Sequence, residues 1–156
     1  MLEGNTKGAI LVVTYVGWHT PHTQAVAGNF HGTNLPSRIM HEPYDKRLGR
    51  QFDFKVKYRL YKPEEGGRKT VLYQGIRYDF AYSDFGTNDF NVYMIWPEFE
   101  NENGQVITED FELIKETGTA RMWIINEDLR NFHKDRIEIG TKGFMMEGNR
   151  KMENLK

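Results

Sequence analysis

Alternating hydrophobic and polar positions define the clearest element of this 156-residue chain. Between residues 52 and 60 every second side chain is apolar, and charged residues fill most of the places between them. A period of two is typical of a half-buried antiparallel strand. The apolar members are Phe52, Phe54, Val56, Tyr58 and Leu60, and the polar ones include Lys55, Lys57 and Arg59. The sequence therefore predicts a strand with a basic outer face.

The residues after this strand predict a reversal and further strands. Pro63 lacks the N–H that a strand ladder needs, and the Glu-Glu-Gly-Gly run at 64–67 supplies the backbone freedom for a turn. Residues 70–73 are then expected to return as the second arm of a hairpin. Two more alternating segments, at 76–82 and 90–96, predict two more strands.

The rest of the chain is typical of short strands and tight turns. Apolar runs separated by turn residues predict strands at 9–16, 106–107, 111–114, 120–125, 136–139, 144–146 and 150–155. Residues 97–105 are expected to be a loop and 127–134 a helical turn, and 17–50 show no clear period. We therefore expect a small all-β fold, a sandwich or barrel, and more specifically a closed or nearly closed antiparallel barrel. The barrel would occupy residues 51–156, and residues 1–50 would form a strand and loop-rich extension packed on it.

Composition narrows the class of protein. Hydrophobic residues make up 38% of the chain and charged residues 28%, and there are ten Phe, eight Tyr and three Trp, as expected for one folded core. The absence of cysteine excludes disulfides, zinc-thiolate sites and thiol nucleophiles, and suits the cytoplasm. The longest apolar run is far short of the roughly twenty residues of a membrane-spanning helix. We expect a cytoplasmic protein without a membrane partner.

Catalytic motifs are absent from the sequence. No G-x-x-x-x-G-K-[ST] string is present for phosphate binding, and the two serines, Ser37 and Ser83, lie outside any G-x-S-x-G elbow. His19, His22, His31 and His41 are interpreted as ordinary loop histidines rather than metal ligands. The carboxylates between residues 98 and 112 are interpreted as solvated surface rather than a glycosidase pair. We expect no enzymatic activity, no metal and no cofactor.

The charges are unevenly distributed although the net charge is only −1. Residues 83–128 hold eleven acidic and two basic side chains, whereas residues 51–82 hold seven basic and four acidic ones. Interleaved with that basic stretch are Tyr73, Tyr78 and Tyr82. Such a surface could bind an RNA backbone and stack bases. The alternative is the solvated face of a sheet whose tyrosines pack inward, and both interpretations stay open here.

A resemblance to a known family follows from the same stretch. Residues 54–70, with Glu65-Gly66-Gly67-Arg68-Lys69-Thr70, are followed by Gly75-Ile76-Arg77 and Phe80. This succession of a strand, E-G-G-R-x-T and G-x-R-x-x-F resembles the C-terminal β-barrel domain of elongation factor Tu. Looser similarity at Arg136, Ile139 and 148–150 extends it over about residues 52–155. Ser83, where the family has an arginine, and an acidic insertion at 97–118 depart from the family pattern.

The resemblance implies a six-stranded antiparallel barrel that contacts aminoacyl-tRNA and carries no catalysis or GTP site itself. The residues that match the family's loop near tRNA are Gly66, Gly67, Arg68 and Thr70, with Lys69 in place of a histidine. We thus expect a non-enzymatic, translation-related binding module for RNA, such as tRNA or another structured RNA, or for a protein partner. The expected binding residues are Lys55, Lys57, Arg59, Gly66, Gly67, Arg68, Lys69, Thr70 and Arg77. The alternative is a barrel that holds a small molecule in an aromatic-lined pocket.

Overall fold

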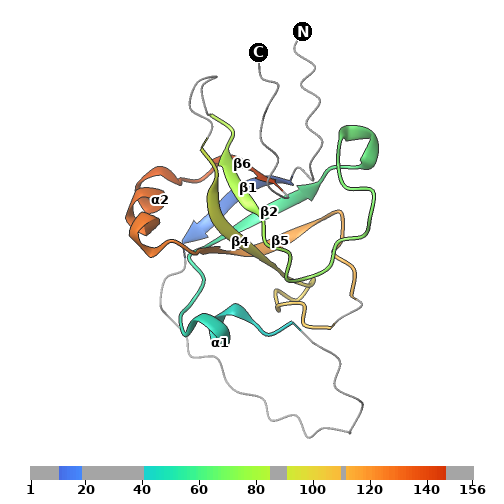
Figure 1. The fold of residues 1–156 in the computed structure, drawn as a ribbon, viewed down its shortest axis with the longest axis horizontal. Coiled ribbons are helices and arrows are strands. Elements are labelled where there is room, and N and C mark those ends of the chain that lie inside the picture. The colour runs from blue at the N-terminus through green and yellow to red at the C-terminus, as the bar shows by residue number, and fades with distance from the viewer. Residues whose placement is uncertain (1–10, 19–40, 85–90, 110–111, 147–156) are drawn as a thin grey trace, which may run out of the picture.

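The structure is a computed structural model that describes residues 11–18, of which only the backbone is considered, and residues 41–84, 91–109 and 112–146. Its elements are short strands with two short helices and two 3-10 turns (Figure 1). The strands are β1 (Leu11–Trp18), β2 (Phe54–Leu60), β3 (Asp79–Tyr82), β4 (Tyr93–Phe99), β5 (Thr117–Ile124) and β6 (Lys142–Met146). The helices are α1 (Tyr44–Leu48) and α2 (Arg130–Arg136), and the 3-10 turns are η1 (Pro63–Glu65) and η2 (Glu127–Leu129).

The strands form one curled, barrel-like antiparallel sheet. The pairing order is β1-β2-β5-β4-β3-β6, and β6 pairs in turn with β1. In Figure 1 the sheet wraps around a central core, with α2 at one side and α1 below it. The small all-β fold expected from the sequence is therefore confirmed. The division into a 1–50 extension and a 51–156 barrel stays a prediction, although β1 itself lies within the sheet between β2 and β6.

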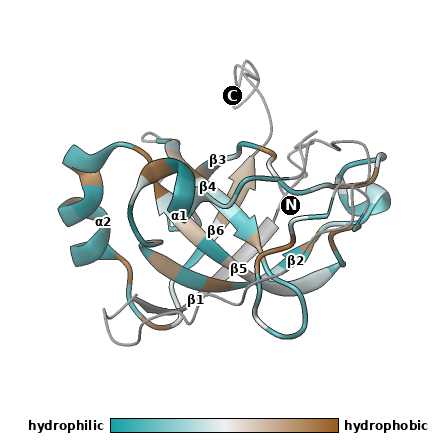
Figure 2. Ribbon diagram, turned by 90° about the horizontal axis from the view of Figure 1, so that it is seen from below, coloured by the Kyte–Doolittle hydropathy of each residue, from teal (hydrophilic) through white to brown (hydrophobic). Residues whose placement is uncertain are grey.

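The core consists of inward side chains from the alternating strands. In β2, Phe54, Val56 and Tyr58 are buried, whereas Lys57 between them is exposed. This confirms the strand predicted from the alternation. Figure 2 shows the same change between hydrophobic and hydrophilic positions along the strands, and a largely hydrophilic α2. Burying one such large apolar side chain contributes about 1.5–3 kcal/mol, so the period of β2 fixes which face points inward.

The register of β4 differs from the expectation. The sequence predicts Phe90, Val92, Met94 and Trp96 as the inward set, but Phe90 lies outside the described residues, and Val92 and Met94 are about half exposed. Ile95, Pro97 and Phe99 point inward instead. The two alternating sets are both apolar here, so period two alone does not choose between them.

The predicted loop at 97–105 therefore begins too early, because Pro97 is part of β4 and pairs with Met122 of β5. Strand β3 pairs with β4 only at Tyr93 and Met94. At Pro97 no described strand lies on that side of β4, and this is why a residue without an N–H is tolerated.

Other expected strands also differ from the structure. Residues 70–73 form no strand ladder, and residues 136–139 lie at the end of α2 and in the turn that follows. Within the irregular 17–50 stretch, α1 is a helix. The helical turn expected at 127–134 is confirmed by η2 and α2. The expected strand at 150–155 lies outside the described residues, as does Phe111.

A buried carboxylate attaches the segment before β2 to the outer face of the sheet. Glu98 of β4 is 1% exposed, although outward-facing charged residues are normally solvated. Its Oε1 accepts a hydrogen bond from the Tyr44 backbone N–H at 2.7 Å and lies 2.9 Å from His41 Nε2. Its Oε2 accepts from Trp123 Nε1 at 3.2 Å. Glu98 thus holds α1 against β4 and β5.

A second buried carboxylate joins three segments at the C-terminal end of β5. Asp53 Oδ2 accepts from Arg50 at 2.9 Å and from the Ile124 N–H at 2.8 Å. Its Oδ1 accepts from Arg130 of α2 at 2.7 Å. The carboxylate of Asp53 therefore connects the residues before β2, the end of β5 and the start of α2.

Removing the Glu98 carboxylate tests this attachment. We expect Glu98→Ala to destabilise the protein by about 3 kcal/mol, because it leaves the Tyr44 and Trp123 donors without their acceptor in a buried place. The matched control is Glu102→Ala, an exposed carboxylate paired with Lys115, which should leave the free energy of unfolding almost unchanged. Urea unfolding monitored by Trp fluorescence measures both. Equal small effects would show that the Glu98 contacts contribute little.

A buried histidine makes the stability depend on pH. His133 of α2 is fully buried, and its Nδ1 lies 2.6 Å from the Tyr82 hydroxyl. Among the described residues its Nε2 has no hydrogen-bond partner. The rings of Tyr93 and Phe132 pack around it. Burial, together with the positive charge of Arg136, lowers the pKa of His133 to about 4. Folding therefore favours the neutral imidazole.

The sign of the pH effect follows from this lowered pKa. His133 contributes its full stabilisation above its unfolded pKa of about 6.5, and the contribution is lost as the pH falls toward 4. Between pH 7.5 and 4.5 we expect this group to cost the wild type about 2–3 kcal/mol that His133→Phe does not lose. Urea unfolding at several pH values measures the difference. Parallel curves for the two proteins would contradict the buried neutral state.

Candidate functional site

A pocket lies where β2 leaves the sheet. The chain departs after Leu60 and returns at residues 70–72, and between these walls is a pocket of about 220 Å³. In Figure 1 the loop after β2 stands out from the sheet at this place. The apolar lining is Leu60, Tyr61, Val71, Leu72, Tyr78 and Ile114, and the polar lining is Lys62, Arg68, Thr70 and Glu116.

The segment before β5 fixes both walls of the pocket. The Leu60 N–H donates to the Glu116 carbonyl at 2.7 Å, and the Ile114 N–H donates to the Leu72 carbonyl at 3.1 Å. One stretch of main chain therefore holds the departing and the returning segment. The loop of residues 63–69 leaves a gap between the departing and the returning segment, and this gap is the pocket.

The glycines of the predicted site shape this loop. After η1, Gly66 has a φ of 89°, a conformation that L side chains rarely adopt. The Gly67 N–H donates to the Lys62 carbonyl at 2.8 Å, and a Cβ at Gly67 would lie 1.8 Å from the Tyr61 carbonyl oxygen. The turn expected from the sequence at these residues is therefore present. The structure gives both glycines a conformational role.

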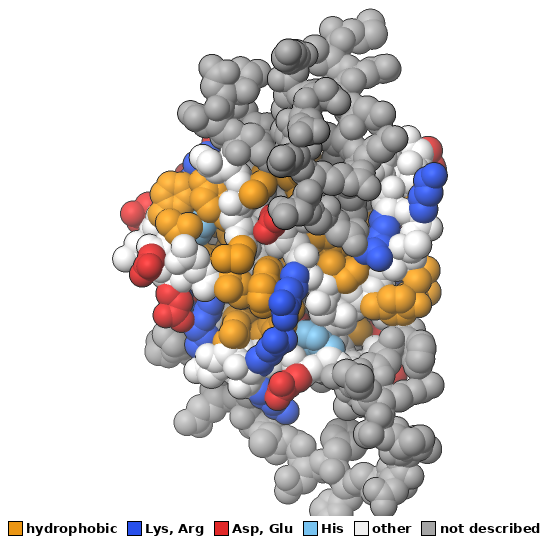
Figure 3. Space-filling model, in the orientation of Figure 1, with side chains coloured by type: hydrophobic (Ala, Val, Ile, Leu, Met, Phe, Trp, Pro, Cys, Tyr) orange, Lys and Arg blue, Asp and Glu red, His pale blue; other side chains and the backbone are white. Residues whose placement is uncertain are grey.

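The predicted basic residues do not form one continuous patch. On the face shown in Figure 3, the Lys and Arg side chains lie in several places with hydrophobic side chains among them. Arg68 and Thr70 come together at the pocket, where Arg68 Nε donates to Thr70 Oγ1 at 2.5 Å. Arg77 lies over the Trp96 ring, 4.7 Å from its centroid, and lines no part of the pocket. Lys57 and Lys69 are exposed.

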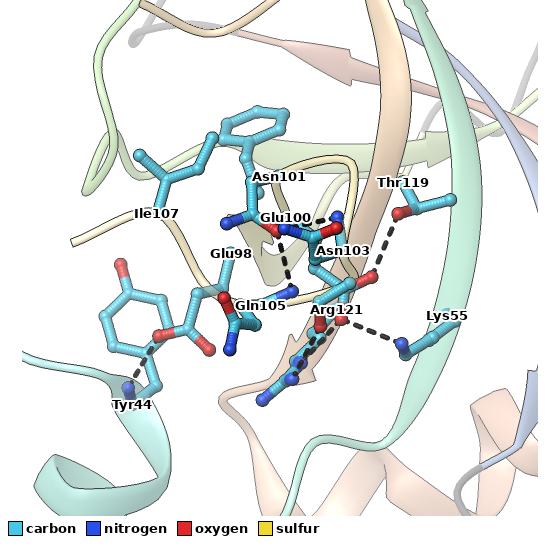
Figure 4. Close-up of polar contacts among 12 residues, drawn as sticks. Tyr44, Lys55, Glu98, Glu100, Asn101, Asn103, Gln105, Ile107, Thr119 and Arg121 are labelled. Atoms are coloured by element: carbon cyan, nitrogen blue, oxygen red, sulfur yellow. Dashed lines mark hydrogen bonds and ion pairs between the residues drawn. The ribbon is translucent and has the colours of Figure 1, made fainter. Parts of the chain in front are cut away.

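Lys55 of β2 is neutralised by a buried carboxylate. Glu100 is 5% exposed and receives Lys55 Nζ at 2.8 Å, Arg121 Nε at 2.7 Å and the Thr119 hydroxyl at 2.9 Å (Figure 4). Burial alone would raise the pKa of Glu100, but hydrogen bonds from Lys55, Arg121 and Thr119 lower it overall. The expectation that Glu98 and Glu100 are solvated surface is thus wrong, because segments distant in sequence supply their donors.

Two further cations, Arg59 and Lys62, are also paired with carboxylates. Arg59 donates to both oxygens of Glu65, at 3.0 and 2.9 Å, and its guanidinium lies over the Tyr61 ring. The Lys62 backbone N–H and then Arg59 lower the pKa of Glu65. Lys62 Nζ lies 3.9 Å from Glu116. The basic charges near the pocket are therefore largely satisfied by carboxylates of the same chain.

Exposed apolar residues occur in or next in sequence to the pocket lining, and the sequence did not predict them as a binding site. Val71 is 51% exposed and Leu113 is 52% exposed, and Tyr73 is also accessible. These residues adjoin the pocket lining in sequence, and Val71 belongs to it. Large apolar side chains clustered on a surface are typical of binding sites. No sequence signal joins 60–62, 70–72 and 114–116, since only the main-chain bonds of the fold bring them together.

Comparisons with protein-family models, with curated proteins and with solved structures found no match. The resemblance to the elongation factor Tu domain therefore stays a prediction. Among the described residues no group of three or more His, Cys, Asp or Glu side chains could hold a metal ion. In the part of the chain that the structure describes, no helix is long and apolar enough to cross a membrane.

Substituting a loop glycine tests the pocket geometry. We expect Gly67→Ala to shift the loop and to cost at least about 2 kcal/mol, because the new methyl group would overlap the Tyr61 carbonyl. Gly49→Ala is the control, since Gly49 has a φ of 65° but open space around it, and should cost only about 1 kcal/mol. Thermal unfolding gives the stabilities. Amide chemical shifts should move at residues 61–72 in the first variant only, and unchanged shifts there would contradict the packing.

Proposed function

We propose that this protein is a non-enzymatic binding module that holds a protein partner at the pocket beside residues 70–72. The observation that carries the proposal is the pocket itself, with its apolar lining and the exposed Val71 in its wall. Protein interfaces draw most of their binding energy from a few large side chains that fill such desolvated pockets.

The arrangement of aromatic side chains favours a protein over an RNA partner. Base stacking needs accessible ring faces. Of the three tyrosines interleaved with the basic stretch, Tyr78 and Tyr82 are each 2% exposed and belong to the core, and only Tyr73 is accessible. With Lys55 and Arg59 bound to Glu100 and Glu65, few cations of this strand remain for phosphates.

The interior of the sheet argues against the small-molecule alternative. The ring of strand pairings supports a closed barrel of six strands, similar to the translation-factor domain. Its inside is filled by the protein's own side chains, including the fully buried Phe54, Ile95, Phe99, Met122 and Met145. A barrel of this size has no room for a ligand within.

The size of the pocket also fits one anchoring side chain. Pockets for drug-sized ligands have volumes of about 300–1,000 Å³, and at about 220 Å³ this one is smaller. It is open to solvent between two chain segments rather than enclosed. A partner would place one apolar side chain in it and cover the exposed Val71.

The test is a selection from a displayed library of random twelve-residue peptides against the full chain. We expect enriched peptides to bind the wild type and to lose at least about tenfold in affinity to Val71→Glu, which places a charge at the pocket. The matched control is Ile139→Glu, because Ile139 is 85% exposed and lines no part of the pocket. The affinity of the enriched peptides for Ile139→Glu should differ from that for the wild type by less than about twofold.

Two outcomes would overturn the proposal. One is no enrichment, or enriched peptides that tolerate Val71→Glu as well as Ile139→Glu. The other is a complex with tRNA, seen by fluorescence anisotropy, that weakens with salt and with Lys57→Ala and Lys69→Ala. That result would restore RNA as the partner.

A further inference from the structure

The returning segment presents an open main-chain edge. Exposure alternates over residues 71–73, with Val71 and Tyr73 accessible and Leu72 buried, as in an extended strand. The Leu72 carbonyl accepts from the Ile114 N–H. In an extended chain the N–H and C=O groups of neighbouring residues point to opposite edges. Within the described part of the chain, the main-chain groups of Val71 and Tyr73 have no hydrogen-bond partner.

We propose that residues 70–73 bind an extended peptide segment of the partner by strand addition, with one apolar side chain of that peptide in the pocket. This inference rests on the proposed function and specifies the kind of partner. Main-chain hydrogen bonds to the Val71 and Tyr73 edge supply affinity without regard to sequence, and the pocket supplies selectivity. Val71 lines the pocket, so a strand paired at this edge lies beside its opening.

The charges at this edge define the peptide further. Lys69 is exposed, and among the described residues no carboxylate lies within ion-pair distance of it. Arg68 forms part of the pocket wall one residue earlier. The carboxylate of the opposite wall, Glu116, already faces Lys62. A carboxylate in the bound peptide, two residues from the anchoring residue and so on the same face, would therefore meet Lys69.

The peptide that this edge selects is thus an alternating one. Side chains of a strand point to opposite faces in turn, so the anchoring residue and those two places away share the face toward the pocket. An apolar residue at the anchor, with Asp or Glu two residues away from it, fills the pocket and pairs with Lys69 at once. The partner segment must be short and extended. A helix could not pair with this edge, because its main-chain N–H and C=O groups are already hydrogen-bonded within the helix.

The experiment uses the peptides enriched on the full chain and a variant that removes one main-chain donor. We expect Val71→Pro to weaken binding at least about tenfold, since proline has no N–H. Val71→Thr is the matched control, because it keeps the N–H and the β-branched shape, and should lose less than about threefold. Lys69→Glu should weaken peptides that carry a carboxylate and spare those without one. Thermal unfolding of each variant checks that it folds.

Hydrogen exchange keeps the test decisive if Val71→Pro does not fold. In the wild-type complex the Val71 and Tyr73 amides should become protected at least about tenfold, and N-methylating the peptide amides that face them should abolish binding. Peptides that need the pocket, as judged by Val71→Glu, but leave these amides unprotected would overturn strand addition while the proposed function stands. If no peptide needs the pocket, the proposed function itself fails.

Discussion

The arrangement of the sheet depends on carboxylates that are buried on its outer face. Asp53, Glu98 and Glu100 each expose 5% or less of their surface, and burying an unpaired carboxylate would cost several kcal/mol. Each is therefore surrounded by donors from other segments. Because the donors of Glu98 come from the residues before β2 and those of Asp53 from Arg50 and α2, these carboxylates determine where both helices lie. The helices themselves are too short to be stable alone.

These carboxylates also change how the basic face of β2 is interpreted. Alternating cations on β2 predict a surface for an anionic partner, yet Lys55 is bound to Glu100 and Arg59 to Glu65. An RNA phosphate would have to replace contacts that already exist. What is left unsatisfied near the predicted loop is the Lys69 cation together with apolar surface and main chain around Val71 and Tyr73. Partner binding through those groups requires no loss of internal ion pairs.

The sequence predicts an element well where its two faces differ. In β2, apolar and charged residues alternate, so the strand and its inward face were predictable, although β2 begins at Phe54 and not at Phe52. In β4 both faces are apolar, because α1 covers the outer one, and the register was therefore ambiguous. The burial of Glu98 and Glu100 was not predictable, since their donors, such as Trp123 and Arg121, are distant in sequence. The Gly66-Gly67 turn was predictable because its conformational requirement is local.

The pocket has its origin in a local interruption of the sheet. Pro63 and the two glycines turn the chain away from the line of β2. The segment before β5 continues, and its Ile114 N–H donates to the Leu72 carbonyl where the chain returns. Exposed strand edges with apolar side chains are a liability, which proteins usually limit with charges, prolines or a covering element. Here Lys69 lies at one end, but Val71 and Tyr73 remain accessible in the described structure. A partner strand would convert that liability into a binding site, and this is the physical reason to assign the function to this edge.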